Sequence, residues 1–286
     1  MKTLQKISLF ALVSILFISC KKEGQVQEEV IEHKKIVSLS GAITETLVAL
    51  GQEEKIVGVD VTSTYPQYIK DKAKDLGHVK VISAENVIAL QPTLVLASDK
   101  DLSPELITKL QTANIQVKII HQEQSIEGTK QFIKDIATAI GSSVDYSSLI
   151  KDIDTNIAKM IQFESKPKVL FIYARGAGAI MVAGRNTPME KMIEIAGGQN
   201  VVRDFEDFKP LTPESLIRYN PDYILLFDKG LKSIGGIEGL LKVQGIEQTI
   251  AGKNKQIISM DGAFLSGFGP RVGQAARELN QLLSKQ

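Results

Sequence analysis

The chain has 286 residues, of which 43% are apolar, so it can bury one large core or two. Its 34 lysines and arginines nearly balance its 33 aspartates and glutamates, which excludes a broad charged surface for nucleic acid. Any partner must therefore be recognised by local chemistry.

Residues 1–19 have the pattern of a secretory signal peptide. Two lysines precede an apolar run, Ile7 to Ile18, that is too short for a comfortable membrane span. Cys20 follows this run and is the only cysteine, so no intramolecular disulfide can form. Its position resembles the lipobox of bacterial lipoproteins, although Phe17 replaces the usual leucine; an unmodified cysteine is the alternative. We predict an exported protein, held at the membrane by lipidated Cys20 and a charged tether (20–34), with the body facing the periplasm.

Residues 35–140 are predicted to alternate between strands and helices. Short aliphatic runs indicate strands, and longer segments that begin at serine or proline and end at glycine, asparagine or proline indicate helices. The predicted strands are 36–39, 56–59, 94–97 and 117–120, and the predicted helices are 41–50, 66–74, 83–92, 103–114 and 125–140. This alternation predicts an α/β lobe with parallel strands.

An internal repeat relates this lobe to the second half of the chain. The stretch from Ser83 to Lys100 has a second copy from Thr212 to Lys229, 129 residues later. Within it, Glu85 aligns with Glu214, and a proline, an aspartate and a lysine also coincide. Each copy predicts a capped helix followed by a strand that is buried on both faces. The repeat therefore predicts two similar lobes.

A helical segment lies between the two copies, from Tyr146 to about Phe163, within a predicted connecting region 141–165. The second lobe, 166–286, is predicted to hold strands at 168–173, 180–182, 223–227 and 256–259, and helices at 187–196, 236–243 and from 271 to 283. The predicted fold is α/β, with two Rossmann-like lobes joined by one long helix. Strand-end loops would then meet in a cleft between the lobes.

These segments resemble the substrate-binding proteins of ABC importers whose lobes are joined by a single helix, the class III periplasmic binding proteins. That group carries cobalamin, ferric siderophores and haem. The likeness is greatest to periplasmic haem-binding proteins, and its motifs are 62–66, 83–85, 181–187, 197–200, 208–211 and 267–271. It implies a non-enzymatic protein that captures haem as a transported ligand and delivers it to an ABC permease dimer with its ATPase.

The resemblance also implies an iron ligand, at a position where this chain departs from the family. The family has Gly-Tyr-(apolar)-Arg before the first repeat glutamate, with the tyrosine as axial ligand, whereas this chain has Gly77-His78-Val79-Lys80. Neutral imidazole also binds iron, and it must lose its proton to do so. We therefore predict His78 as an axial ligand and Tyr173, from the other lobe, as a candidate for the second face. The alternatives are a loop histidine bonded to backbone and a packed core tyrosine.

Other residues are predicted to contact the macrocycle or its propionates. Aromatic side chains would cover the flat ring, and a guanidinium can bind a propionate through two hydrogen bonds. These haem-pocket candidates are Tyr65, Arg175, Arg185, Phe208, Phe268 and Arg271. Core packing for the aromatic residues, and support of their own loops for the arginines, are the alternatives.

Glu85 and Glu214 are predicted to dock on the permease. Glutamates at these two places, one in each lobe, dock on permease arginines in the group that the chain resembles. A carboxylate in the first turn of a helix also interacts favourably with the helix dipole, so both roles can hold together.

Two other classes of function stay open. Within the same fold, the ligand would be cobalamin or a ferric siderophore. An enzyme, such as a haem chelatase or a metal-dependent hydrolase, is the rival from another class. Against hydrolysis, the three histidines are far apart and form no His-x-x-His or Glu-x-x-His pair, and no nucleophile elbow is present.

Overall fold

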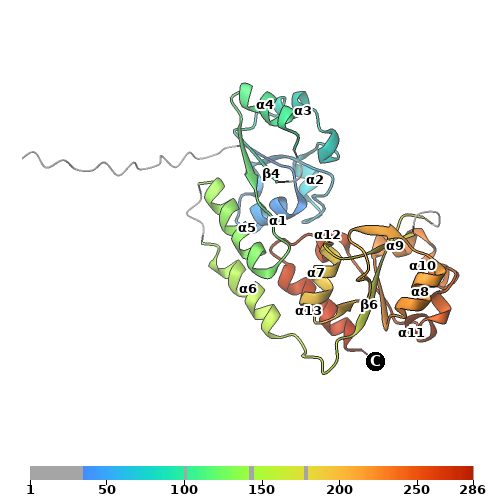
Figure 1. The fold of residues 1–286 in the computed structure, drawn as a ribbon. Coiled ribbons are helices and arrows are strands. Elements are labelled where there is room, and N and C mark those ends of the chain that lie inside the picture. Colours follow the sequence, from blue (N-terminus) through green and yellow to red (C-terminus); the bar gives the residue numbers. More distant parts are fainter. Residues whose placement is uncertain (1–34, 100–101, 142–144, 177–179, 286) are drawn as a thin grey trace, which may run out of the picture. The chain divides into compact units, whose positions relative to one another are not determined.

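Two β-sheets, one in each half of the chain, organise the structure (Figure 1). The computed structural model describes residues 35–99, 102–141, 145–176 and 180–285, which all belong to one compact unit. The predicted signal peptide, Cys20 and the tether lie outside the described residues.

The first sheet has five parallel strands in the order β3-β2-β1-β4-β5. The central strands are mainly aliphatic and fully buried, as parallel strands between two helical layers must be. The strands are β1 (Ile36–Ser38), β2 (Ile56–Val59), β3 (Lys74–Asp75), β4 (Leu94–Ser98) and β5 (Gln116–Ile120).

Helices cover both faces of this first sheet. Alternate residues of β4 divide between two cores, with Leu94 and Leu96 packing against α1 and α5, and Val95 and Ala97 packing against α3 and α4. Serine hydroxyls cap three of these helices, each by accepting the backbone N–H of the third helical residue. The helices are α1 (Gly41–Ala49), α2 (Ile69–Lys72), α3 (Ala84–Ile88), α4 (Pro104–Thr112) and α5 (Ile126–Ala139).

The second sheet is mixed, with the order β11-β10-β6-β7-β9, and β8 also pairs with β6. Strands β6, β10 and β11 are parallel, whereas β7 runs antiparallel to β6 and β9 antiparallel to β7. The strands are β6 (Lys168–Ala174), β7 (Ile180–Ala183), β8 (Gln199–Asn200), β9 (Phe208–Pro210), β10 (Tyr223–Phe227) and β11 (Ile257–Met260).

Seven helices of the described chain belong to this second lobe: α7 (Pro188–Ile195), α8 (Pro213–Tyr219), α9 (Asp228–Ser233), α10 (Gly236–Leu241), α11 (Ile250–Lys253), α12 (Gly262–Ser266) and α13 (Val272–Leu283). The two repeat copies form the same unit in each lobe, α3 then β4 and α8 then β10, and the predicted two-lobed α/β architecture is confirmed. No helix in the described ranges combines the length and apolarity that crossing a membrane requires.

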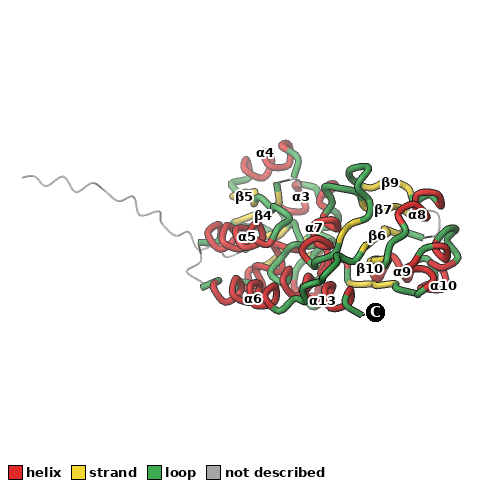
Figure 2. Tube along the Cα trace, turned by 60° about the horizontal axis from the view of Figure 1, so that its bottom comes forward, coloured by secondary structure: helices red, strands yellow, loops and turns green. Residues whose placement is uncertain are grey.

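The connecting helix is shorter than the sequence predicts. Helix α6 (Ser147–Ala158) lies beside α5 and α13 in both views (Figures 1 and 2), but it ends five residues before the predicted limit at Phe163. The reason is a tertiary contact: the buried amide of Asn280 accepts the Ile161 N–H at 2.7 Å and donates to the Ile161 carbonyl at 2.9 Å. Asn280 thus replaces the helical hydrogen bonds that Ile161 would otherwise make.

This contact gives a stability prediction. Replacing Asn280 with alanine leaves the backbone groups of Ile161 and the Ala196 carbonyl, which Asn280 also binds at 3.0 Å, without their partner. We expect the free energy of unfolding to fall by about 3 kcal/mol, because several buried polar groups lose their hydrogen bonds. Urea unfolding followed by circular dichroism measures it. The control is Asn254→Ala at an exposed site, which we expect to change the value by less than about 0.5 kcal/mol; an equal effect of both variants would contradict the assignment.

Candidate functional site

A cavity of about 790 Å³ lies between the two lobes, a size typical of small-molecule sites. The segments that follow β1, β2, β3 and β5, with the last residue of β4, line it from the first lobe, and the ends of β6 and β10, with the segments that follow β6, β10 and β11, line it from the second. These are the carboxyl ends of parallel strands, where ligands of α/β folds bind. We call this space the interlobe cavity.

A buried polar network shapes the first-lobe wall. Asp60, only 1% exposed, accepts hydrogen bonds from the Thr62 N–H and hydroxyl at 3.0 and 2.6 Å and from the Ser63 hydroxyl at 2.8 Å. The Thr62 hydroxyl in turn accepts the Gly41 N–H at 2.9 Å, which joins the loop to the start of α1. A Cβ on Gly41 would lie 2.6 Å from the Thr62 carbonyl oxygen, so glycine permits this approach. The network fixes the loop that carries Tyr65 to the cavity.

His78 lies on the cavity wall, on the loop between β3 and α3. Its side chain is exposed, and its Nδ1 accepts the backbone N–H of Lys80 at 3.2 Å. In the neutral imidazole this contact assigns the proton to Nε2. Binding a metal through Nε2 therefore requires that the proton leave that nitrogen. His121 does not line the cavity; its Nδ1 lies 2.6 Å from Asp99 Oδ2.

Aromatic rings form part of the second-lobe wall. Tyr173, near the end of β6, lines the interlobe cavity together with Phe227, the last residue of β10. Their ring centroids are 6.3 Å apart in an edge-to-face arrangement. The Tyr173 hydroxyl has no hydrogen bond to another described residue, so it is available to a ligand.

Two cations line the same wall. Arg175 and Lys229 are both exposed at the cavity, and neither has an ion pair within the described part of the chain. The cavity carboxylates, in contrast, have partners: Asp60 through its network, Asp261 through the Phe264 N–H at 2.9 Å, and Glu45 through an arginine described below. Only Glu45 has a cationic partner, whereas Asp60 and Asp261 are held by neutral donors. The two cations of the second lobe therefore lie at a wall that also carries two carboxylates.

Arg271 differs from its predicted role. Instead of lining the interlobe cavity, it crosses to the first lobe and binds Glu45 of α1 with Nε and Nη2, at 2.9 and 2.8 Å. Its guanidinium also lies 3.5 Å from the ring centroid of Tyr65, with Phe264 at 4.9 Å. Both charged side chains are largely buried, 22% and 11% exposed. Arg271 thus joins the lobes beside the cavity, and its guanidinium is already occupied.

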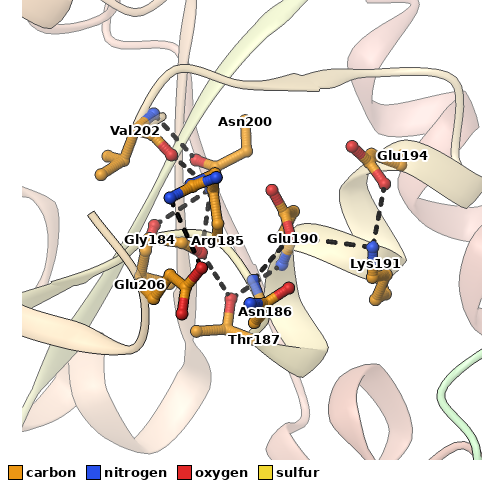
Figure 3. A network of polar contacts seen from close by, with 11 residues as sticks. Gly184, Arg185, Asn186, Thr187, Glu190, Lys191, Glu194, Asn200, Val202 and Glu206 are labelled. Atoms are coloured by element: carbon orange, nitrogen blue, oxygen red, sulfur yellow. Dashed lines mark hydrogen bonds and ion pairs between the residues drawn. The ribbon is translucent and has the colours of Figure 1, made fainter. Parts of the chain in front are cut away.

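Three other candidates also lie away from the cavity lining. Phe268 is 1% exposed, and its ring belongs to the second-lobe core. Its φ is +48°, and its carbonyl accepts a hydrogen bond from the Thr129 hydroxyl at 3.3 Å. Phe208 packs behind Tyr173, with ring centroids 6.1 Å apart. Arg185 braces its own segment, as its sequence alternative proposed: it pairs with Glu206 at 3.4 Å (Figure 3).

Glu85 and Glu214 occupy matching places. Each is exposed in the first turn of its helix, α3 or α8, which precedes a central strand of its lobe. A hydrogen bond from its own N–H, with a second from the Ser83 hydroxyl, lowers the pKa of Glu85. Its carboxylate therefore stays ionised to lower pH than an ordinary glutamate.

Sequence reasoning assigned no role to several cavity residues, notably Glu45, Gln122, Phe227 and Lys229. For Phe227 and Lys229 a signal existed, because both follow the buried run of β10, at the carboxyl end where ligands bind. Glu45 lies within a helix and Gln122 follows an edge strand, so only the packed lobes show where they face.

The interlobe ion pair gives a second stability prediction. Glu45→Gln leaves the largely buried guanidinium of Arg271 without its counter-charge, and we expect the free energy of unfolding to fall by about 2 kcal/mol. Glu206→Gln is the matched control, because its pair with Arg185 is about half exposed on both sides, and it should cost less than about 1 kcal/mol. Thermal or urea unfolding of both variants measures the two effects. If both variants lose the same free energy of unfolding, the interlobe ion pair stabilises the protein no more than an exposed pair does.

Known proteins are similar to this chain in sequence and in fold. Residues 36–263 match the periplasmic binding protein family. The periplasmic heme-binding protein RhuT from Roseiflexus sp. RS-1, in apo form, is 38% identical, with a TM-score of 0.81 over 87% of this chain and 97% of that one.

Two curated relatives differ in what their names record. An uncharacterised ABC transporter substrate-binding lipoprotein of Bacillus subtilis, YvrC, is 31% identical over 87% of this chain and 79% of its own length. A vitamin B12-binding protein of Vibrio vulnificus is 24% identical over 84% of this chain and 86% of its own. The match over most of the chain, together with the two-lobed fold, means that this protein belongs to the periplasmic binding protein family, which binds substrates and is not enzymatic.

Proposed function

We propose that this protein is the substrate-binding lipoprotein of an ABC importer, captures haem in the interlobe cavity and delivers it to the permease. The observation that carries the proposal is the set of side chains on that cavity. His78 from one lobe and Tyr173 from the other line the same cavity, and so do Arg175 and Lys229, which have no ion pair among the described residues. The likeness to the heme-binding protein RhuT supports the same ligand.

The donor set suits an iron macrocycle better than a bare metal ion. The described residues hold no group of three or more His, Cys, Asp or Glu side chains that could bind an ion. Haem supplies four nitrogen ligands itself and needs only one or two from the protein. A single histidine with a tyrosine opposite is therefore sufficient for haem and insufficient for free iron.

The cations on the second lobe suit the acidic edge of haem. Its two propionates are carboxylates, which Arg175 can bind through two hydrogen bonds and Lys229 as a point charge. Because Arg185 and Arg271 already have carboxylate partners, Arg175 and Lys229 are the cationic groups that we assign to the propionates. Tyr65 and Phe227 would cover the apolar part of the ring.

Delivery of the ligand would depend on residues outside the cavity, namely the two repeat glutamates and the N-terminal cysteine. Glu85 and Glu214 would dock on the permease, one from each lobe, as in the group that the sequence resembles. Cys20 would hold the exported protein at the membrane through its lipid, so that each ligand is captured close to the importer.

The ligand assignment can be tested by titrating purified protein with haemin. We expect a shifted Soret band, and we expect His78→Ala to alter the ferric spectrum and weaken binding at least tenfold, because the imidazole ligand is lost. His121→Ala is the control, since that histidine does not line the cavity. An unchanged Soret band with the unaltered protein, or a His78→Ala spectrum equal to that of the parent, would refute the proposal.

The propionate contacts can be tested separately from the iron. Arg175→Gln and Lys229→Gln should each weaken haemin binding about tenfold, because each removes a charge-assisted hydrogen bond. Neither should affect haemin dimethyl ester, whose carboxylates are blocked. Lys232→Gln, on the same helix as Lys229 but outside the cavity lining, is the control. If the two variants lose the same affinity for haemin and for its dimethyl ester, Arg175 and Lys229 support the fold and do not bind the propionates.

A corrinoid is the second candidate, and the vitamin B12-binding relative of Vibrio vulnificus favours it. A corrinoid brings its own axial ligands, so it needs the aromatic wall of the cavity but not His78. Competition between haemin and cyanocobalamin distinguishes the two ligands. If the ligand is haem, cyanocobalamin should not displace bound haemin. If cyanocobalamin displaces haemin, and does so equally well from the His78→Ala variant, the corrinoid is favoured.

A further inference from the structure

The two docking glutamates do not stand alone on their helices. Three positions after each glutamate, on the same helical face, lies an isoleucine that is exposed: Ile88 at 37% and Ile217 at 46%. The residues just before these isoleucines, Val87 and Leu216, are fully buried in the lobe cores. Each helix therefore buries one aliphatic residue and leaves the next one outside.

The internal repeat extends this match by one more residue. Val81, the most exposed large apolar side chain of the described chain at 78%, lies 129 positions before Pro210, which is also exposed. The same shift relates Glu85 to Glu214 and Ile88 to Ile217. We call Val81, Glu85 and Ile88 the first docking patch, and Pro210, Glu214 and Ile217 the second.

Both glutamates lie at the edge of their lobe where the parallel strands end, and the first patch adjoins the interlobe cavity. Helices that connect parallel strands run antiparallel to them, so their N-termini lie at the edge where the strands end. Glu85 and Glu214 lie in the first turns of α3 and α8, and Val79, two residues before Val81, lines the cavity itself. Figure 1 shows α3 and α8 on different lobes.

Exposure of one isoleucine is ordinary, but the same exposed glutamate and isoleucine on α3 and on α8 are not explained by either core. Val81 and Pro210 add exposed apolar surface from unlike elements, a 3-10 helix (Val79–Val81) and the end of β9. Neither glutamate has an ion pair among the described residues, and both are exposed, so each patch offers a carboxylate without a counter-charge beside apolar surface. The matching partner presents, at two points, a cationic side chain surrounded by apolar residues. A dimer with two-fold symmetry has such a repeated surface.

We propose that Val81 and Ile88 in one lobe, and Pro210 and Ile217 in the other, form the apolar part of two matched docking patches for a two-fold symmetric permease, around Glu85 and Glu214. The proposal rests on the importer function proposed above and adds the side chains that exclude water from the ion pairs. Apolar neighbours of this kind strengthen a charged contact by desolvating it.

The test measures docking and ligand binding on the same variants. Ile88→Ser, Ile217→Ser and the double variant are compared with the parent for binding to the importer's permease–ATPase complex in nanodiscs, with and without haemin. We expect each single variant to weaken docking about tenfold and the double variant at least fiftyfold, because the patches lie on separate lobes. Haemin affinity in solution should stay within about twofold, since neither residue lines the cavity.

Two controls carry the same substitution at equally exposed sites. Ile119→Ser on β5 of the first lobe and Ile237→Ser on α10 of the second, each 42% exposed, should leave docking unchanged. If the docking variants bind the permease as the controls do, the inference is wrong while the importer function stands. If the docking variants bind the permease weakly but the parent protein does not bind haemin, the patches are supported and the haem assignment fails.

Sedimentation tests a second copy of the chain as the occupant. If the variants change self-association but not permease binding, the patches contact a second copy and the proposal is overturned.

Discussion

The ion pair between Arg271 and Glu45 sets how the two lobes face each other beside the cavity. Every candidate ligand contact depends on that relation, because His78 and Tyr65 belong to the first lobe and Tyr173 and Lys229 to the second. The pair has two hydrogen bonds, and the aromatic ring of Tyr65 lies under the guanidinium. A side-chain amide of the first lobe, that of Gln122, adds a further link by donating to the Gly267 carbonyl at 2.9 Å. The spacing of the two walls is therefore held by side chains as well as by the connecting helix.

Much of the fold follows from local sequence signals. Buried strands, serine caps and the 129-residue repeat are local patterns, and the central strands of both sheets lie within a residue or two of their predicted limits. The connecting helix was predicted too long because its apolar pattern continues to Phe163, while the residue that ends it, Asn280, is 119 positions from Ile161. Short elements such as β8 and α11 have no periodic pattern long enough to detect.

The site was predicted less completely, for a physical reason. Tyr173 and Arg175 lie at the end of a strand, which the fold class places at the cavity, and His78 was predicted from the position of a family motif; all three line the cavity. Arg185 and Arg271 come from motifs, and a motif does not show whether a guanidinium finds a ligand or an internal carboxylate. Glu206 and Glu45 occupy those two guanidinium groups. The competing partner lies far away in sequence for Arg271, 226 positions from Glu45, so only tertiary packing reveals it.

The internal repeat allows the two lobes to be compared position by position, and they are alike around Glu85 and Glu214 but differ at the cavity wall. In the proposed docking patches two of the three repeat-related positions keep the same residue, glutamate with glutamate and isoleucine with isoleucine. At the cavity the same register pairs unlike residues: Ser98 of the first lobe corresponds to Phe227 of the second, and both line the cavity. A symmetric partner requires like residues at both ends, whereas a ligand with one acidic edge and one apolar edge requires unlike walls.

The hydrogen bond between Lys80 and His78 bears on how a bound ligand would be released. In the cavity as it stands, the Lys80 N–H occupies Nδ1, and the neutral ring keeps its proton on Nε2. If His78 binds iron through Nε2, as proposed above, the proton would move from that nitrogen and the ring would lose its backbone contact; loss of the iron would restore it. His78 and Glu85 belong to one short segment, which joins the cavity wall to the first of the proposed docking patches, so a ligand at His78 and a partner at Glu85 would contact the same segment. A tyrosinate at this position would offer no comparable exchange, since its single oxygen either binds the metal or does not.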